Sequence, residues 1–238
     1  MLILFDIDAT LLTTTRAGLY AMADAGKRLH GESFDLGQVE FAGCLDPVIL
    51  TDALRRNGHE PTPERLLAIR QEYIRCIDIR LRQPGLAKTC PGVPELVDAL
   101  ETAPGVTLGL LTGNFPESGM RKLEAAGLDP GRFPVRAWGD DSPHESPLRD
   151  HLPPVAMRRY HEHHGRPITG ERVVVIGDTP HDVRCAKVNG CRVLGVGTGL
   201  FPAERLLAEG ADHATPTLED TESMVRWLLS SPPSAVVA

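Results

Sequence analysis

LILFDID (residues 2–8) combines a short apolar run with two acids. No polar residue alternates within residues 2–5, which is typical of a strand buried on both faces of a parallel sheet. Similar runs recur at residues 106–111, 172–176 and 192–196, and a weaker one at 133–138. Because helical patterns separate these runs, we predict an α/β fold with a Rossmann-like, doubly wound parallel sheet.

Residues 9–105 break this alternation, because they show no convincing strand pattern. Three helical patterns occur there instead, at residues 17–29, 47–56 and 63–82. The connection is too long for a simple crossover. We therefore predict a small helical domain (residues 15–88) inserted into an α/β core (residues 1–14 and 89–238). It would lie over the carboxyl ends of the strands, where ligands bind in this fold class.

The composition is that of a globular domain: 42% of the 238 residues are hydrophobic, 24% are charged, and the net charge is −7. These values exclude a disordered chain, a collagen and a coiled coil. The sequence has no Lys/Arg run, so we expect no nucleic-acid partner. We also expect no membrane association, since no apolar run approaches the roughly 20 residues of a membrane span.

The remaining composition signals point to the cytoplasm. The N-terminal residues lack the basic region of a signal peptide. The five cysteines are scattered without metal-binding spacing, and we expect free thiols in a reducing compartment. They are Cys44, Cys76, Cys90, Cys185 and Cys191. The C-terminal SPPSAVVA (residues 231–238) is expected to be a frayed tail.

Acids follow two of the expected strands. Asp6 and Asp8 end the first run, and their spacing places both side chains on one side of an extended segment. Asp178 and Asp182 follow the run at 172–176. Solvated acids at a turn are one interpretation of the first pair, and a capping box between Thr179 and Asp182 is one interpretation of the second.

If those two strands are neighbours, three carboxylates converge and repel one another. A divalent cation would remove this conflict. An all-oxygen site with few protein ligands suits Mg²⁺, which shares oxygens with phosphate groups. Thr112-Gly113-Asn114 ends another strand, where it forms either an anion cradle or an ordinary turn. Gly195-Val-Gly197-Thr-Gly199 reads as a turn.

Three stretches in this order resemble the haloacid dehalogenase-like hydrolase superfamily: FDIDATLL (5–12), LLTGN (110–114) and VIGDTPHDV (175–183). The helical insertion after the first resembles the subfamily with a helical cap, and the nearest likeness is to phosphoglycolate-phosphatase-like members. The resemblance covers essentially the whole chain.

The resemblance implies catalytic roles for the first two stretches. Asp6 would attack phosphorus to form an aspartyl-phosphate. Asp8 would protonate the leaving alcohol and then activate water. Thr112, with the amides of Gly113 and Asn114, would hold the phosphoryl oxygens.

The resemblance also implies a metal site and a cation. Asp6, the backbone carbonyl of Asp8, and Asp178 would bind Mg²⁺, with Asp182 as a further ligand or a support. The superfamily has a Lys or Arg between its second and last motifs. No Lys lies between positions 122 and 187, and Arg149 in PLRDHLPPVAMRR (147–159) resembles the arginine form. Arginine can pair with phosphate and carboxylate together.

Some positions bear on specificity. Ala9 stands where the superfamily usually has Gly; because Ala disfavours a positive φ, we expect a slightly altered turn. Thr10 is typical of phosphatases, whereas mutases often have Val. The loop at residues 41–46 resembles the substrate-contacting loop of the cap. Gly43 would approach the phosphate ester, and Leu45 replaces a common Thr.

These observations predict a cytoplasmic, magnesium-dependent phosphatase, active as a monomer or homodimer. It would hydrolyse a small phosphorylated metabolite, phosphoglycolate-like or a sugar phosphate. Two alternatives are a phosphosugar mutase, against which Thr10 argues, and a non-enzymatic receiver module. A receiver needs about half this length and would have no use for Asp8 or a cap.

Overall fold

The computed structural model describes residues 1–37 and 39–230; the predicted frayed tail lies outside them. A six-stranded sheet with the order β5-β4-β1-β6-β7-β8 forms the core, and every neighbouring pair is parallel. Its strands are β1 (Leu2–Phe5), β4 (Thr107–Leu111), β5 (Val135–Ala137), β6 (Val173–Gly177), β7 (Arg192–Val196) and β8 (His213–Thr215). This confirms the predicted α/β class with a doubly wound parallel sheet.

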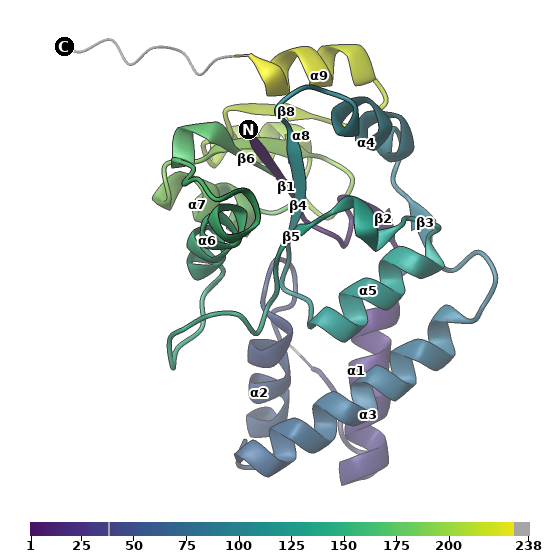
Figure 1. Ribbon diagram of the computed structural model, residues 1–238. Helices are drawn as coiled ribbons and strands as arrows, with labels where there is room; N and C mark the ends of the chain where they lie inside the picture. The colour runs from purple at the N-terminus through teal and green to yellow at the C-terminus, as the bar shows by residue number, and fades with distance from the viewer. Residues whose placement is uncertain (38, 231–238) are drawn as a thin grey trace.

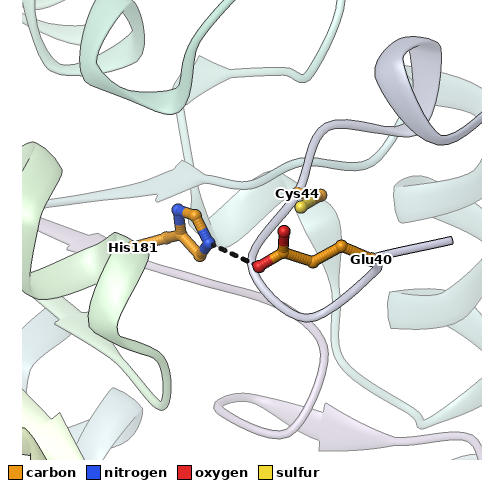
Figure 2. A group of neighbouring side chains, drawn as sticks. All are labelled: Glu40, Cys44 and His181. Atoms are coloured by element: carbon orange, nitrogen blue, oxygen red, sulfur yellow. Dashed lines mark ion pairs between the residues drawn. The ribbon is translucent and has the colours of Figure 1, made fainter. Parts of the chain in front are cut away.

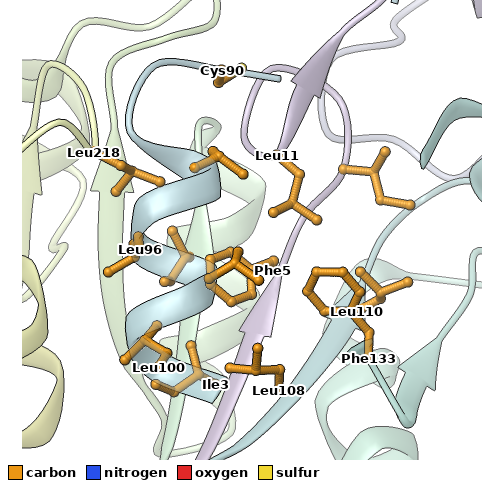
Figure 3. Packing of buried hydrophobic residues seen from close by; sticks show 14 of the residues in the cluster. Ile3, Phe5, Leu11, Cys90, Leu96, Leu100, Leu108, Leu110, Phe133 and Leu218 are labelled. Carbon is orange, nitrogen blue, oxygen red and sulfur yellow. The ribbon is translucent and has the colours of Figure 1, made fainter. Parts of the chain in front are cut away.

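Helices cover both faces of this sheet, which explains why its central strands β1 and β6 are continuously apolar. Ile3 and Phe5 pack on one face, and Leu2 and Leu4 pack on the other. Figure 3 shows the first cluster around Phe5, whose ring meets that of Phe133 edge to face. The helices on that side are α4 (Val93–Glu101), α5 (Pro116–Ala125) and α9 (Thr221–Leu229). Those on the other side are α6 (Leu152–His164), α7 (Pro180–Val188) and α8 (Ala203–Ala208).

Three helices follow the first strand, close to their predicted bounds: α1 (Ala17–His30), α2 (Asp46–Arg56) and α3 (Pro63–Leu81). Thr62 caps α3 by accepting a hydrogen bond from the Arg65 amide. The three helices share a hydrophobic cluster that includes Tyr73 of α3 and Phe34 from the segment after α1. Figure 1 shows them below the sheet, with α5 lying against them. We call this group the cap; its limits at residues 15 and 88 remain a prediction.

Four short elements were not foreseen. Strands β2 (Leu12–Thr13) and β3 (Lys88–Thr89) pair antiparallel where the chain leaves the core and returns to it. Strand β8 and helix α8 extend the far edge of the fold. The three strands have only two or three residues, too few to show periodicity, so only tertiary pairing reveals them. Helix α8 has six residues, less than two helical turns, which is also too short for a clear pattern. Among the described residues, no helix is both long and apolar enough to cross a membrane.

Candidate active site

The carboxyl ends of β1 and β6 bring the predicted acids together. The two strands are neighbours, with Phe5 opposite Ile176, and Asp6 follows one while Asp178 follows the other. Carboxylate oxygens of Asp6, Asp178 and Asp182 lie within 4.8 Å of one another, and all three residues are buried. Segments remote in the sequence therefore build one acidic cluster.

This cluster is electrostatically strained. Burial, opposed by the charge of Arg149 and reinforced by Asp182, raises the pKa of Asp6 to about 6. Burial and the like charges of Asp182 and Asp6 raise the pKa of Asp178 well above its usual range. Both shifts mean that the folded chain resists holding all these groups as anions.

Arg149 supplies the compensating cation. It lies in the 3₁₀ turn η2 (Arg149–His151), is buried, and its Nη2 is 3.0 Å from Asp6 Oδ1 and 2.6 Å from Asp182 Oδ1. Its Nη1 donates to the carbonyl of Gly43 in the cap at 3.3 Å. The residue singled out by resemblance thus contacts both the acids and the cap.

Asp182 has two structural roles. Its Oδ2 accepts from the amide and hydroxyl of Thr179 at 3.0 and 2.7 Å, which confirms the capping box. Its buried Oδ1 faces Arg149 as an ion pair, but no described donor reaches that oxygen with hydrogen-bond geometry. The capping box and the charge cluster are therefore parts of one arrangement.

The chemistry of these residues fits a divalent cation. The cluster offers only carboxylate oxygens, the donors that Mg²⁺ prefers. Three buried acids face one arginine, and Asp182 Oδ1 still has an unsatisfied lone pair among the described residues. A cation bound here would relieve the repulsion that raises the pKa of Asp178.

Asp8 lies beside this cluster and is held by a residue that sequence reasoning missed. Lys122 Nζ, on α5, is 2.5 Å from Asp8 Oδ2 and donates to Asn114 Oδ1 at 3.1 Å. Asn114 Nδ2 donates to the same Asp8 oxygen at 3.0 Å. One signal could have found Lys122, because it lies four residues after Ser118 on the buried face of the helix that follows Thr112.

The turn after β4 touches the cap directly. Thr112 is buried, and the carbonyl of Gly113 accepts from the amide of Asp46 at 2.7 Å. A Cβ at Gly113 would lie 2.1 Å from the carbonyl oxygen of Cys44, so only glycine permits this approach. The side chain of Asn114 is committed to Asp8 and Lys122. Its backbone amide donates to Thr112 Oγ1 at 3.4 Å, a long hydrogen bond that an anion can replace.

The cap loop also reaches the segment that carries Asp182. A Cβ at Gly43, whose φ is +72°, would lie 2.6 Å from Thr179 Oγ1. Figure 2 shows Glu40 and Cys44 beside His181, with the imidazole 3.5 Å from the Glu40 carboxylate. Burial raises the pKa of the Cys44 thiol to about 11, which disfavours the thiolate that a metal would need. The cap loop packs against the start of α7 here, and this contact brings Glu40 beside His181.

The turn after Asp8 corrects one expectation. Ala9 does adopt a positive φ, +58°, where we expected alanine to avoid it. Its amide donates to the carbonyl of Leu12 at 2.7 Å, and its carbonyl accepts from the hydroxyl of Thr198. These contacts offset the cost of about 1–2 kcal/mol for a left-handed residue with a side chain. The turn therefore keeps the shape that a glycine would allow.

Two further contacts shape the acidic cluster. Thr10 is buried and its hydroxyl donates to Asp178 Oδ1 at 3.3 Å. A Cβ at Gly199 would lie 1.8 Å from Asp178 Oδ2, so the glycine-rich turn after β7 closes over this acid. The turn predicted at residues 195–199 is present, but it also packs on the site.

A cavity of about 540 Å³ joins these groups. Its lining includes Asp6, Asp8, Thr112, Lys122 and Arg149 from the core. The cap contributes Gly43, Tyr73 and apolar side chains such as Met22. This volume suits a small molecule enclosed between cap and core.

Comparison with known proteins identifies a family for this chain. The family model for haloacid dehalogenase-like hydrolases matches residues 3–187. No curated protein matches the sequence significantly. Among solved structures, CbbY from Rhodobacter sphaeroides in complex with phosphate has a TM-score of 0.71 at 22% identity, covering 92% of this chain and 95% of that one.

Two other solved structures share the fold. A predicted phosphoglycolate phosphatase from Haemophilus somnus has a TM-score of 0.68 at 20% identity, covering 94% of this chain and 97% of that one. A candidate β-phosphoglucomutase from Bacteroides vulgatus has a TM-score of 0.71 at 22% identity, covering 97% and 89% respectively. At these identities the likeness concerns the fold alone.

Proposed function

Because the chain belongs to the haloacid dehalogenase-like hydrolases, we propose that it is a magnesium-dependent phosphatase that hydrolyses a small phosphomonoester through an aspartyl-phosphate. The observation that carries the proposal is that Asp6 and Asp8 share a cavity but have different partners. They line one cavity, yet Asp6 is paired with Arg149 and Asp8 with Lys122. Two carboxylates in such different environments suit two different chemical roles.

In the first half of the reaction, a carboxylate oxygen of Asp6 attacks phosphorus. Arg149 orients that carboxylate, while Thr112 and the amide of Asn114 bind phosphoryl oxygens. As the bond between phosphorus and the ester oxygen breaks, Asp8 gives its proton to the departing alcohol. The product is an aspartyl-phosphate on Asp6.

In the second half, Asp8 takes a proton from a water molecule, which attacks the phosphorus of the intermediate. The bond to Asp6 breaks, and inorganic phosphate leaves with the enzyme restored. The cap covers part of the cavity and so limits the water that reaches the intermediate, while Asp8 directs the molecule that attacks. Cap contacts at Gly43 and Asp46 hold the cap against the core.

Asp6, Asp178 and the backbone carbonyl of Asp8 are the proposed ligands of Mg²⁺, with Asp182 supporting them. When bound there, the ion would neutralise charge on the phosphoryl group. Thr10 and Gly199 hold Asp178 in place as a ligand. The proposed compartment is the cytoplasm, and the proposed substrates are phosphoglycolate-like compounds or sugar phosphates.

The decisive experiment replaces the proposed nucleophile. Asp6→Asn should abolish Mg²⁺-dependent release of phosphate from p-nitrophenyl phosphate and from a panel of phosphorylated metabolites that includes phosphoglycolate. Asp98→Asn, which changes an exposed acid on α4, serves as the matched control and should remain active. Retained activity in Asp6→Asn would refute the assigned nucleophile.

The same panel separates a phosphatase from a mutase. A sugar 1-phosphate converted to its 6-phosphate without release of phosphate would identify a mutase. We expect phosphate release instead. In either case the intermediate on Asp6 is the same.

A further inference from the structure

The proposed reaction gives no role to one buried charge, the ammonium group of Lys122. Its side chain is 3% exposed, and it extends from the buried face of α5. The Nζ atom is 2.5 Å from Asp8 Oδ2 and 3.1 Å from Asn114 Oδ1. A buried ammonium is costly unless it is well paired, so these contacts require an explanation.

The residues around Lys122 restrict where its ammonium group can lie. A Cβ on Gly18 of α1 would lie 3.2 Å from Nζ, so a larger residue there would crowd it. The charge of Lys122 also offsets part of the pKa increase of the buried Asp46 carboxyl. The ammonium is therefore enclosed by cap residues on one side and by Asp8 on the other.

The two carboxylate oxygens of Asp8 have different contacts, and this difference matters for proton transfer. Lys122 and Asn114 both donate to Oδ2, and they also bind each other. This closed triangle restrains the carboxyl group in position and in rotation. Among the described residues, no side chain donates to Oδ1, and Asp8 lines the cavity. Oδ1 is therefore the oxygen left for the substrate.

We propose that Lys122 is a positioning residue that acts through Asp8, by holding Oδ2 so that Oδ1 exchanges protons with the leaving group and the attacking water. The proposal rests on the proposed function. In the first step the proton on Asp8 passes to the ester oxygen as its bond to phosphorus breaks. In the second step a water proton returns to Asp8.

Leaving groups of different basicity test this role. A phenolate as weakly basic as 2,4-dinitrophenolate departs without protonation, whereas an alkoxide needs it. Lys122→Met should therefore lower kcat/KM for an alkyl phosphate by about 100-fold, within the range of general acid catalysis. For 2,4-dinitrophenyl phosphate the loss should stay below about threefold. Lys187→Met, at an exposed ion pair with Asp212, is the matched control and should change neither value.

A double-mutant cycle provides the second test. In an Asp8→Asn background, Lys122→Met should cause no further loss of kcat/KM on p-nitrophenyl phosphate, because Lys122 would have nothing left to position. Lys122→Gln, which retains a donor, should recover part of the alkyl phosphatase activity. Thermal unfolding of each variant shows whether it is folded, and Asn114→Ala, which removes the other donor, should show the same leaving-group dependence.

Other results would overturn the inference. Equal losses on all leaving groups, or losses that add in the Asp8→Asn background, would place Lys122 on the phosphoryl group itself. An unchanged kcat/KM of Lys122→Met on the alkyl phosphate would show that Lys122 has no role in the reaction. These outcomes differ from failure of the proposed function, in which the unaltered protein would release no phosphate from any substrate.

Discussion

At the scale of single residues, Asp46 shows how one side chain joins the cap to the core. It begins α2, yet its Oδ2 accepts from the amide of Phe115 at 2.9 Å and from the hydroxyl of Ser118 at 3.2 Å. Tyr73 of α3 donates to the same oxygen at 3.4 Å. Burial outweighs the attraction of Lys122 and raises the pKa of Asp46 to about 6.

This pKa has a consequence for stability. The folded chain binds the proton of Asp46 more tightly than the unfolded chain, whose ordinary value is 3.8. Stability therefore falls as pH rises from about 4 to above 6, where the buried carboxylate becomes ionised. The cost reaches about 1–3 kcal/mol above pH 7.

Asp46→Asn should remove this dependence. Relative to the unaltered protein, the variant should gain about 1–3 kcal/mol of unfolding free energy between pH 4.5 and pH 7.5. Urea denaturation at the two pH values measures the difference. Asp52→Asn, at a half-exposed acid of the same helix, should show no such gain. A difference that is constant with pH would contradict the assigned pKa.

At the scale of elements, the loop before α2 holds the cap against the core by close backbone contact. Gly43 lies against Thr179 at the start of α7, and Cys44 lies against Gly113 after β4. Such contacts leave no room for even one methyl group. The activity should therefore depend on glycine at positions 43 and 113.

Gly43→Ala tests this dependence. Displacement of the loop should lower kcat/KM by about 10- to 100-fold, the scale expected when reacting groups move by about 1 Å. Gly58→Ala is a matched control, because Gly58 has a similar φ of +77° in the cap but no atom within 4 Å of its Cβ position. It carries the same backbone strain without the collision. Equal activity losses in the two variants would show that strain alone matters.

At the scale of the whole molecule, the sheet order creates the site. β1 lies between β4 and β6, so Asp6, Thr112 and Asp178 emerge at the same edge. The antiparallel β2–β3 pair, with Leu12 opposite Thr89, holds together the two connections to the cap. The acids, the turn after β4 and the cap then share one cavity.

A cation in this cavity should stabilise the whole fold. At 100 times its Kd, Mg²⁺ should add about 2.7 kcal/mol, which corresponds to an increase in Tm of about 5–10 °C for a chain of this size. The effect should vanish in Asp178→Asn and persist in Glu162→Gln, an exposed acid on α6. A Tm that responds to Mg²⁺ equally in all three proteins would exclude this site.

The sequence by itself determined the α/β class, five of the six core strands, the three cap helices and the acids at the strand ends. Each of these is a local signal: an apolar run, a helical period, or an acid directly after a strand. Arg149 and Gly43 came from resemblance to the family, and the structure lines the cavity with both. Their roles in catalysis remain predictions.

Only the tertiary structure decided how Lys122, Asp46 and Ala9 are used. A lysine on a helix is ordinarily solvated, and no local pattern shows that the cap will bury this one. Asp46 accepts a hydrogen bond from Phe115, 69 positions away in the sequence. The positive φ of Ala9 is supported by a hydrogen bond from Thr198, which is 189 positions away. Such contacts depend on which elements pack together, and sequence periodicity does not predict that packing.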